Sequence, residues 1–132
     1  ASGKNFVKSI MHAVQSQSTL NVVADQRGCP THAADLADVI RIVALGNVEG
    51  ILHMTNRGDC TWHEFARAIV RAMGVDIPVV PISTEMAGRL ARRPAYSVLG
   101  QGRLASLGLA LPFWEEAVTR FVHAAQRSVA AC

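Results

Sequence analysis

The sequence is poor in cysteine and in charge. Its three cysteines, Cys29, Cys60 and Cys132, are widely spaced and form no C-x-x-C pair, which argues against both a disulfide framework and a zinc site. Charged residues make up 17% of the 132 residues and hydrophobic residues 50%, which is enough to build one core. We therefore expect a single domain over residues 1–132 in a reducing, cytoplasmic setting.

Long apolar runs and basic runs are also missing. No stretch reaches the roughly 18 apolar residues that a membrane span needs, so no membrane association is predicted. The 13 Lys and Arg residues exceed the 10 Asp and Glu residues by only three and form no long cluster, which argues against nucleic acid as a partner. Because 11 of these 13 cations are Arg, whose guanidinium fits phosphate oxygens, a phosphorylated small ligand is the better prediction.

The motifs of a complete oxidoreductase or metalloprotease do not occur. No glycine-rich turn that could bind a dinucleotide follows a strand, because Gly100 and Gly102 lack a third glycine. Tyr96, the single tyrosine, has Gly100 four positions on rather than the Lys of a Tyr-x-x-x-Lys pair. His63 and Glu64 lack the second His of a zincin. The chain is therefore predicted to bind no nicotinamide cofactor and no metal.

Hydrophobic periodicity and capping residues predict an α/β fold with several helices and a few short strands. Helices are expected over residues 5–17, 32–45, 61–73, 84–90, 101–107 and from Pro112, which is placed in a first turn. Strands are expected over residues 20–24, 50–55 and 77–82, the last at a sheet edge because of its prolines. Such a small number of strands indicates that part of the sheet is missing.

Three features leave a structural and a functional interpretation open. Asn5 either caps the first helix or marks a helix start that binds an anion. The cluster of Arg89, Arg92 and Arg93 is either a solvated loop or a clamp for a pyrophosphate. Cys29 is either a small buried thiol or, with His32 as its base, the nucleophile of a hydrolase.

Seven segments, in this order, resemble the second half of the dTDP-4-dehydrorhamnose reductase family, which belongs to the extended short-chain dehydrogenases. They are N-F-V-K-S-I-M from Asn5, V-V-A-D-Q-R-G-C-P-T from Val22 with A-D-L-A from Ala34, G-I-L-H-M-T-N from Gly50, T-W-H-E-F-A-R-A-I from Thr61, V-V-P-I-S from Val79, R-R-P-A-Y-S-V-L from Arg92 and L-G-L-A-L-P-F-W-E-E-A from Leu107. Together they span nearly the whole chain. The resemblance implies the C-terminal, substrate-binding part of such an enzyme, with the N-terminal Rossmann portion absent.

The resemblance also implies a reaction and a binding site. The intact family reduces dTDP-4-dehydro-L-rhamnose with NADPH, and this chain would hold the dTDP-sugar without being catalytic alone. Asn5 and Arg93 would face the pyrophosphate, and Arg92 would also belong to the substrate-binding site. Val22, Val23, Pro30 and Thr31 would border the nucleotide. The alternative is a module derived from that fold that binds another copy of itself, the missing Rossmann half or another protein.

Overall fold

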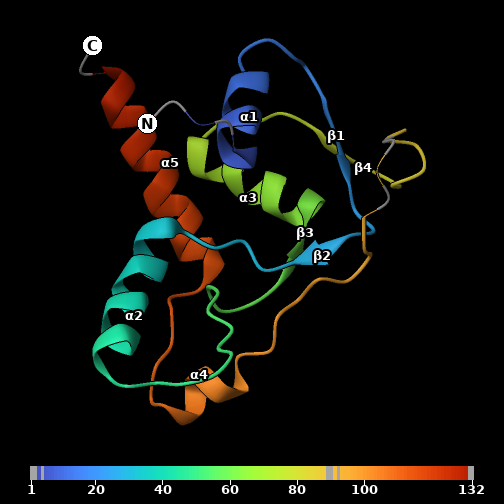
Figure 1. Ribbon diagram of the computed structural model, residues 1–132. Coiled ribbons are helices and arrows are strands. Elements are labelled where there is room, and N and C mark those ends of the chain that lie inside the picture. Colours follow the sequence, from blue (N-terminus) through green and yellow to red (C-terminus); the bar gives the residue numbers. More distant parts are fainter. Residues whose placement is uncertain (1–2, 4, 89–90, 92, 131–132) are drawn as a thin grey trace.

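The computed structural model describes residues 3, 5–88, 91 and 93–130 of the chain. In chain order, the elements are α1 (Phe6–Ala13), β1 (Leu20–Val23), β2 (Arg27–Gly28), α2 (Ala33–Leu45), β3 (Cys60–Thr61), α3 (Trp62–Met73), β4 (Val79–Ile82), α4 (Gly102–Ser106) and α5 (Trp114–Ala130). Figure 1 shows α1, α3, α5, β1 and β4 in the upper part of the molecule and α2 and α4 in the lower part.

The strands form two short pairs. Strands β1 and β4 run parallel, with Leu20 opposite Val79 and Val23 opposite Ile82, and β2 and β3 run antiparallel. Parallel strands need a long connection, which here includes α2 and α3. The mixture of helices with few strands matches the α/β fold that the sequence predicts.

Local signals in the sequence account for the ends of two helices. The Asn5 side chain accepts a hydrogen bond from the Lys8 N–H at 2.8 Å and caps α1. Thr61 and Glu64 form the expected capping box, since Thr61 Oγ1 accepts from the Glu64 N–H and Glu64 accepts from the Thr61 N–H. Gly74 ends α3 with a φ of 70°, a left-handed conformation that favours glycine.

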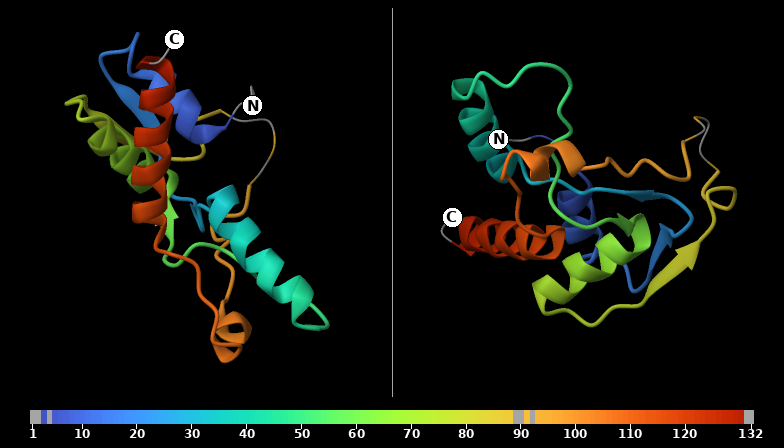
Figure 2. Two further views of the ribbon diagram at one scale, coloured as in Figure 1. Left: turned by 90° about the vertical axis from the view of Figure 1, so that its left-hand side faces the viewer. Right: turned by 90° about the horizontal axis from the view of Figure 1, so that it is seen from below.

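The main core lies between α1, β1, α3 and α5. It is formed by buried apolar side chains that include Ile10, Leu20, Ile69 and Val122, of which Ile69 and Val122 have no exposed surface. A second, smaller cluster of Val39, Leu104 and Leu111 joins α2 to α4. In Figure 2, α2 and α4 extend away from the helices of the main core, so the molecule has two hydrophobic centres.

The strand predicted over residues 50–55 is wrong, because the segment is irregular. Its carbonyl groups are bound by side chains rather than by a neighbouring strand: Arg103 donates to Ile51 O at 2.7 Å and Gln101 donates to Thr55 O at 2.8 Å. The apolar residues that suggested a strand, Leu52 and Met54, instead pack on the second cluster.

Two helix boundaries differ from the prediction, and the helix expected over residues 84–90 is not formed by its described residues. The first helix ends at Ala13, after which hydrogen-bonded turns reach Gln17. Residues 84–88 form turns that include Gly88, whose φ is 59°, and Leu90 lies outside the described residues. Pro112 lies outside α5, because its carbonyl accepts the Arg57 N–H at 2.9 Å in a short bridge before the helix begins.

Within the described part of the chain, none of the helices has the length and apolar character needed to cross a membrane.

Candidate functional site

A cavity of about 570 Å³ opens where the first turns of α1, α2, α3 and α5 meet. We call it the apolar cavity, because aromatic and aliphatic side chains form most of its wall, among them Phe65 and Trp114. Asn5, Pro30 and Thr31 also line it. Helix N-termini carry unpaired N–H groups and a partial positive charge, so the first turns of these helices can favour an anionic group.

A second cavity, of about 490 Å³, lies along β1, and we call it the strand cavity. Val22 and Val23 of β1, which are both buried, form part of its wall. Asn21, Gln26 and Arg93 add polar groups to the same wall. Among the described residues that line the strand cavity, Arg93 is the one with a cationic side chain. The strand cavity thus combines an apolar floor with a guanidinium group.

Two aromatic residues, Phe6 and Trp62, line both cavities. Their ring centroids are 4.7 Å apart, and the Phe6 ring also stacks on Phe65 with centroids 5.4 Å apart. Aromatic pairs at such distances are stabilising beyond the area that they bury. The aromatic pair therefore forms a shared wall that places the two cavities next to each other.

The segment that carries Arg93 is attached to β2. Arg27 N–H donates to Ala95 O at 2.8 Å, and Ser97 N–H donates to Arg27 O at 2.9 Å. Ser97 Oγ donates to the same carbonyl oxygen at 2.9 Å. The Arg27 side chain in turn binds Asp59 at 2.6 Å, which raises the pKa of the guanidinium. These contacts explain how residues far apart in sequence come to border one region.

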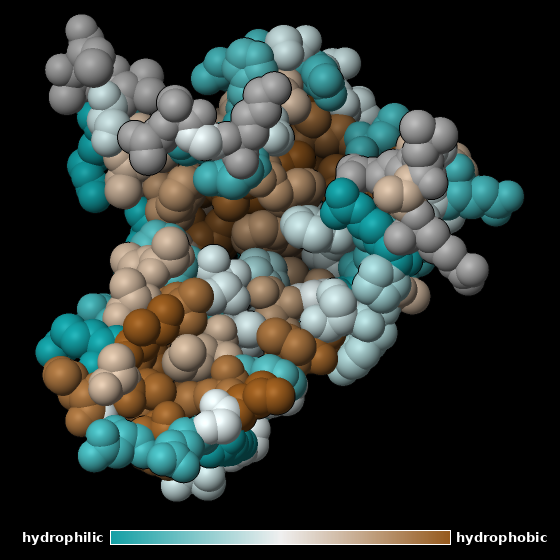
Figure 3. Space-filling model, in the orientation of Figure 1, coloured by the Kyte–Doolittle hydropathy of each residue, from teal (hydrophilic) through white to brown (hydrophobic). Residues whose placement is uncertain are grey.

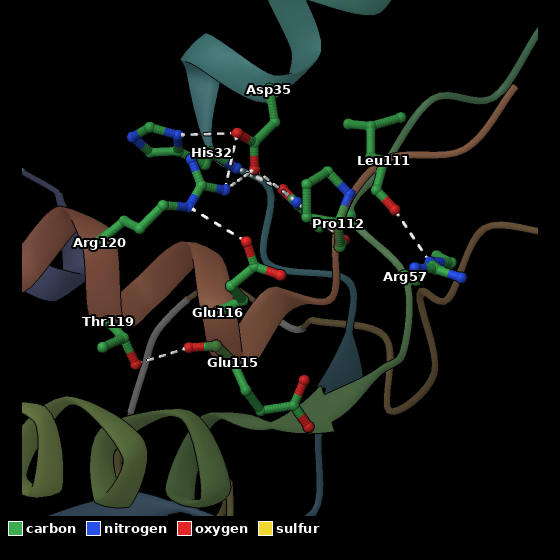
Figure 4. A network of polar contacts seen from close by, with 10 residues as sticks. His32, Asp35, Arg57, Leu111, Pro112, Glu115, Glu116, Thr119 and Arg120 are labelled. Atoms are coloured by element: carbon green, nitrogen blue, oxygen red, sulfur yellow. Dashed lines mark hydrogen bonds and ion pairs between the residues drawn. The ribbon is translucent and has the colours of Figure 1, made fainter.

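A polar network holds the start of α2 against α5 (Figure 4). The fully buried Asn56 accepts the His32 N–H at 2.8 Å and donates to Asp35 at 2.8 Å and to Pro112 O at 3.0 Å. Arg120 donates to both carboxylate oxygens of Asp35 at 2.8 Å. Burial opposes the ionisation of Asp35, but the hydrogen bonds from Asn56 and Arg120 outweigh burial and lower its pKa.

The two described cysteines line the apolar cavity but differ in exposure. Burial and the nearby Glu64 carboxylate raise the pKa of the Cys60 thiol to about 12, so it stays protonated near neutral pH. Cys29 is partly exposed, and its carbonyl accepts a hydrogen bond from Thr31 Oγ1 at 3.1 Å. Among the described residues, no hydrogen bond joins Cys29 to His32, so the geometry of an activated nucleophile is not present.

The structure brings the site residues predicted from the sequence into two neighbouring groups. Asn5, Pro30 and Thr31 lie on the apolar cavity, whereas Val22, Val23 and Arg93 lie on the strand cavity. Arg92 lies outside the described residues, as does Arg89 of the same cluster. In the part of the chain that the structure describes, no group of three His, Cys, Asp or Glu residues is placed to hold a metal ion.

Sequence reasoning missed the residues that join these groups. Phe6 and Trp62 fall within the helices predicted over residues 5–17 and 61–73 and have no other signal in the sequence than that each directly follows a capping residue, Asn5 or Thr61. For His32, the sequence suggests only the role of a base beside Cys29. The available signal was the spacing of three residues between His32 and Asp35 at the start of a predicted helix, which allows the two side chains to meet.

Comparison with known proteins matches residues 1–127 to the family model described as the RmlD substrate binding domain. The chain is 36% identical over 120 residues to the spore coat polysaccharide biosynthesis protein SpsK of Bacillus subtilis, covering 91% of this chain and 42% of that protein. It is 41% identical over 128 residues to a dTDP-4-dehydrorhamnose reductase of Streptomyces griseus, covering 90% of this chain and 41% of the relative.

Solved structures agree with these matches. The crystal structure of a dTDP-4-dehydrorhamnose reductase from Clostridium acetobutylicum superposes with a TM-score of 0.90 at 36% identity, over 96% of this chain and 45% of that one. The dTDP-4-dehydrorhamnose reductase from Bacillus anthracis, solved in complex with NADP, gives a TM-score of 0.86 at 38% identity, covering 92% of this chain and 43% of that one. The chain thus spans less than half the length of these relatives. It belongs to the RmlD substrate-binding domain family and corresponds to the C-terminal, substrate-binding portion of the dTDP-4-dehydrorhamnose reductases.

Proposed function

We propose that this chain binds the dTDP-sugar substrate of an NADPH-dependent dTDP-4-dehydrorhamnose reductase, on the path to dTDP-L-rhamnose. It presents the sugar to chemistry located outside its own residues. The sequence contains neither the glycine-rich turn that would bind the cofactor nor a Tyr-x-x-x-Lys pair that would supply the proton. We propose that the chain alone acts as a binding domain in the cytoplasm and that NADPH is bound by the remainder of the intact enzyme.

The observation that carries this proposal is the convergence of the predicted site residues. Six of the seven lie on two cavities that share an aromatic wall, although they come from segments nearly 90 residues apart in the sequence. An elongated ligand with an apolar ring, two phosphates and a sugar can extend across adjacent cavities. The apolar walls would receive its uncharged parts.

The charges near the cavities support an anionic ligand. Arg93 is exposed and lines the strand cavity. Among the described residues, its guanidinium forms no ion pair. Guanidinium groups bind phosphate oxygens through paired, charge-assisted hydrogen bonds. The capped start of α1 at Asn5 lies on the neighbouring cavity. We infer that the diphosphate lies near the shared wall, between these two groups.

Calorimetric titration of the chain with dTDP tests the proposal. Arg93→Ala should weaken binding about tenfold, which corresponds to the loss of one charge-assisted contact. Arg67→Ala removes another exposed guanidinium, on α3, that lines neither cavity, so the affinity of this variant for dTDP should equal that of the unmodified chain. Absence of heat at millimolar dTDP would contradict the proposal, and an equal loss in both variants would exclude a specific role for Arg93.

A second function, self-association or binding of another protein, is favoured by one observation. Figure 3 shows hydrophobic residues over the lower part of the molecule, around α2 and α4. Leu45 and Ile51 in this part are 78% and 82% exposed, and contiguous apolar surface of this kind commonly marks an interface. Sedimentation velocity over a hundredfold range of concentration tests this idea, since a strictly monomeric species throughout removes self-association.

A further inference from the structure

His32 lies where the apolar cavity meets the polar network at the start of α2. Its backbone N–H is bound to Asn56 Oδ1 at 2.8 Å. Its ring packs edge-on against Phe121 of α5, with ring centroids 6.0 Å apart. The backbone and the ring of this histidine are therefore both held in place.

One edge of the ring is occupied by the network. His32 Nδ1 lies 3.5 Å from Asp35 Oδ1 and is buried, with no hydrogen-bond partner among the described residues. Figure 4 shows this nitrogen directed toward the Asp35 carboxylate, with the other ring nitrogen on the side away from it. A carboxylate beside Nδ1 favours a proton on that nitrogen.

The other edge of the ring is open. The His32 side chain is 25% exposed although Nδ1 is buried, so its accessible surface lies elsewhere on the ring, and the residue lines the apolar cavity. No Lys, Arg, Asp or Glu occurs among the described residues that line this cavity. Of those residues, His32 alone can carry a positive charge near neutral pH.

The charged groups near the ring lie on its Nδ1 side. Asp35 on α2 faces Nδ1, and Arg120 on α5 binds the same carboxylate. Glu116, 3.6 Å from Arg120, lies beyond it. The start of α2 has no side-chain cap, and Asp35 is the acidic residue of its first turn.

We infer that His32 is a ligand-binding residue of the apolar cavity, donating a hydrogen bond from Nε2 to a phosphate oxygen of the bound nucleotide sugar. Asp35 orients the ring through Nδ1. This inference rests on the proposed function, because it needs a diphosphate in or beside the apolar cavity.

Binding of dTDP-L-rhamnose as a function of pH tests this inference. Each phosphate of this probe has a single, strongly acidic hydroxyl, because its other bonds are an ester and the diphosphate bridge, so the charge of the probe stays constant between pH 5.5 and 7.5. An imidazolium donates a charge-assisted hydrogen bond to phosphate that a neutral ring does not, and histidine side chains generally lose this charge between pH 5 and 8. Affinity of the unmodified chain should therefore fall up to about tenfold as the pH rises, and His32→Gln should remove this dependence.

His53→Gln is the matched control, because His53 is exposed and lines neither cavity. It should retain the pH dependence of the unmodified chain. A second measurement, which needs no variant at position 32, is the NMR titration of the imidazole Cε1–H signals. Since binding and protonation are reciprocally linked, the ligand should raise the titration midpoint of His32 and leave that of His53 unchanged.

The outcomes separate this inference from the function on which it rests. Absence of binding at every pH would contradict the proposed function itself. Binding with the same pH dependence in the unmodified chain and in His32→Gln, or a His32 midpoint that the ligand does not move, would overturn the role of His32 alone. Loss of pH dependence in His32→Gln with a raised midpoint in the unmodified chain would support it.

Discussion

The buried amide of Asn56 gives the sharpest test of what holds the two parts of the molecule together. Its side chain links the start of α2, the Asp35 carboxylate and the segment before α5 through three hydrogen bonds of 2.8, 2.8 and 3.0 Å. Asn56→Ala removes all three and leaves the His32 N–H and the Pro112 carbonyl without this partner. We therefore expect Asn56→Ala to lower the free energy of unfolding far more than an ordinary surface substitution does.

The magnitude follows from the kind of each bond. The two bonds to neutral backbone groups contribute about 1 kcal/mol each, and the bond to the ionised Asp35 contributes about 1.5–3 kcal/mol. Asn56→Ala should therefore lower the free energy of unfolding by about 4 kcal/mol, which is a large share of the stability of an ordinary domain. Urea denaturation at pH 7, followed by circular dichroism at 222 nm, measures this change.

Asn21→Ala provides the matched control, because it removes the same amide from an exposed position of β1. Its effect should stay within about 0.5 kcal/mol. A loss below 1 kcal/mol for Asn56→Ala would refute the reasoning, since it would mean that the network contributes no more than surface contacts do.

Three further predictions concern stability, each measured by urea denaturation. The pKa of Asp35 is lowered in the folded state, so its ionised form contributes stability above its unfolded pKa of about 3.9 and less as the pH falls below it; Asp35→Asn should reduce the loss of stability between pH 5 and 3, and an unchanged slope would contradict this. Thr61→Ala removes the cap of α3 and should cost about 1 kcal/mol, whereas no change would exclude a capping role. Gly58→Ala should cost more than Gly74→Ala, although φ is positive at both, because only at Gly58 would the new Cβ lie 3.0 Å from the Trp114 ring; equal costs would refute the close contact.

The sequence predicted best those features that depend on near neighbours. The cap at Asn5 and the capping box of Thr61 and Glu64 involve residues three positions apart, so their chemistry is visible in the sequence. Strands β2 and β3 could not be predicted in this way, because each has two residues and the pairing joins Gly28 to Cys60. Their existence depends on tertiary contacts rather than on a hydrophobic pattern.

The same distinction applies to the candidate site. Asn5 and Arg93 were identified from a helix start and from a motif, and both lie on a cavity. The division of the site into two cavities was not predictable, because it depends on how Phe6 of α1 meets Trp62 of α3. Likewise, the setting of His32 depends on side chains from other elements, which no local pattern specifies.

The most direct test of the central claim is to locate dTDP on the isotopically labelled chain by NMR. The backbone amide signals of residues on both cavities, Asn5, Val22, Val23 and Thr31, should shift as dTDP is added and should reach saturation together. Signals of the exposed face of α2, such as that of Leu45, should remain in place. Binding that shifts only amides away from the two cavities, or no shift at millimolar dTDP, would contradict the account of this chain as a nucleotide-sugar-binding domain.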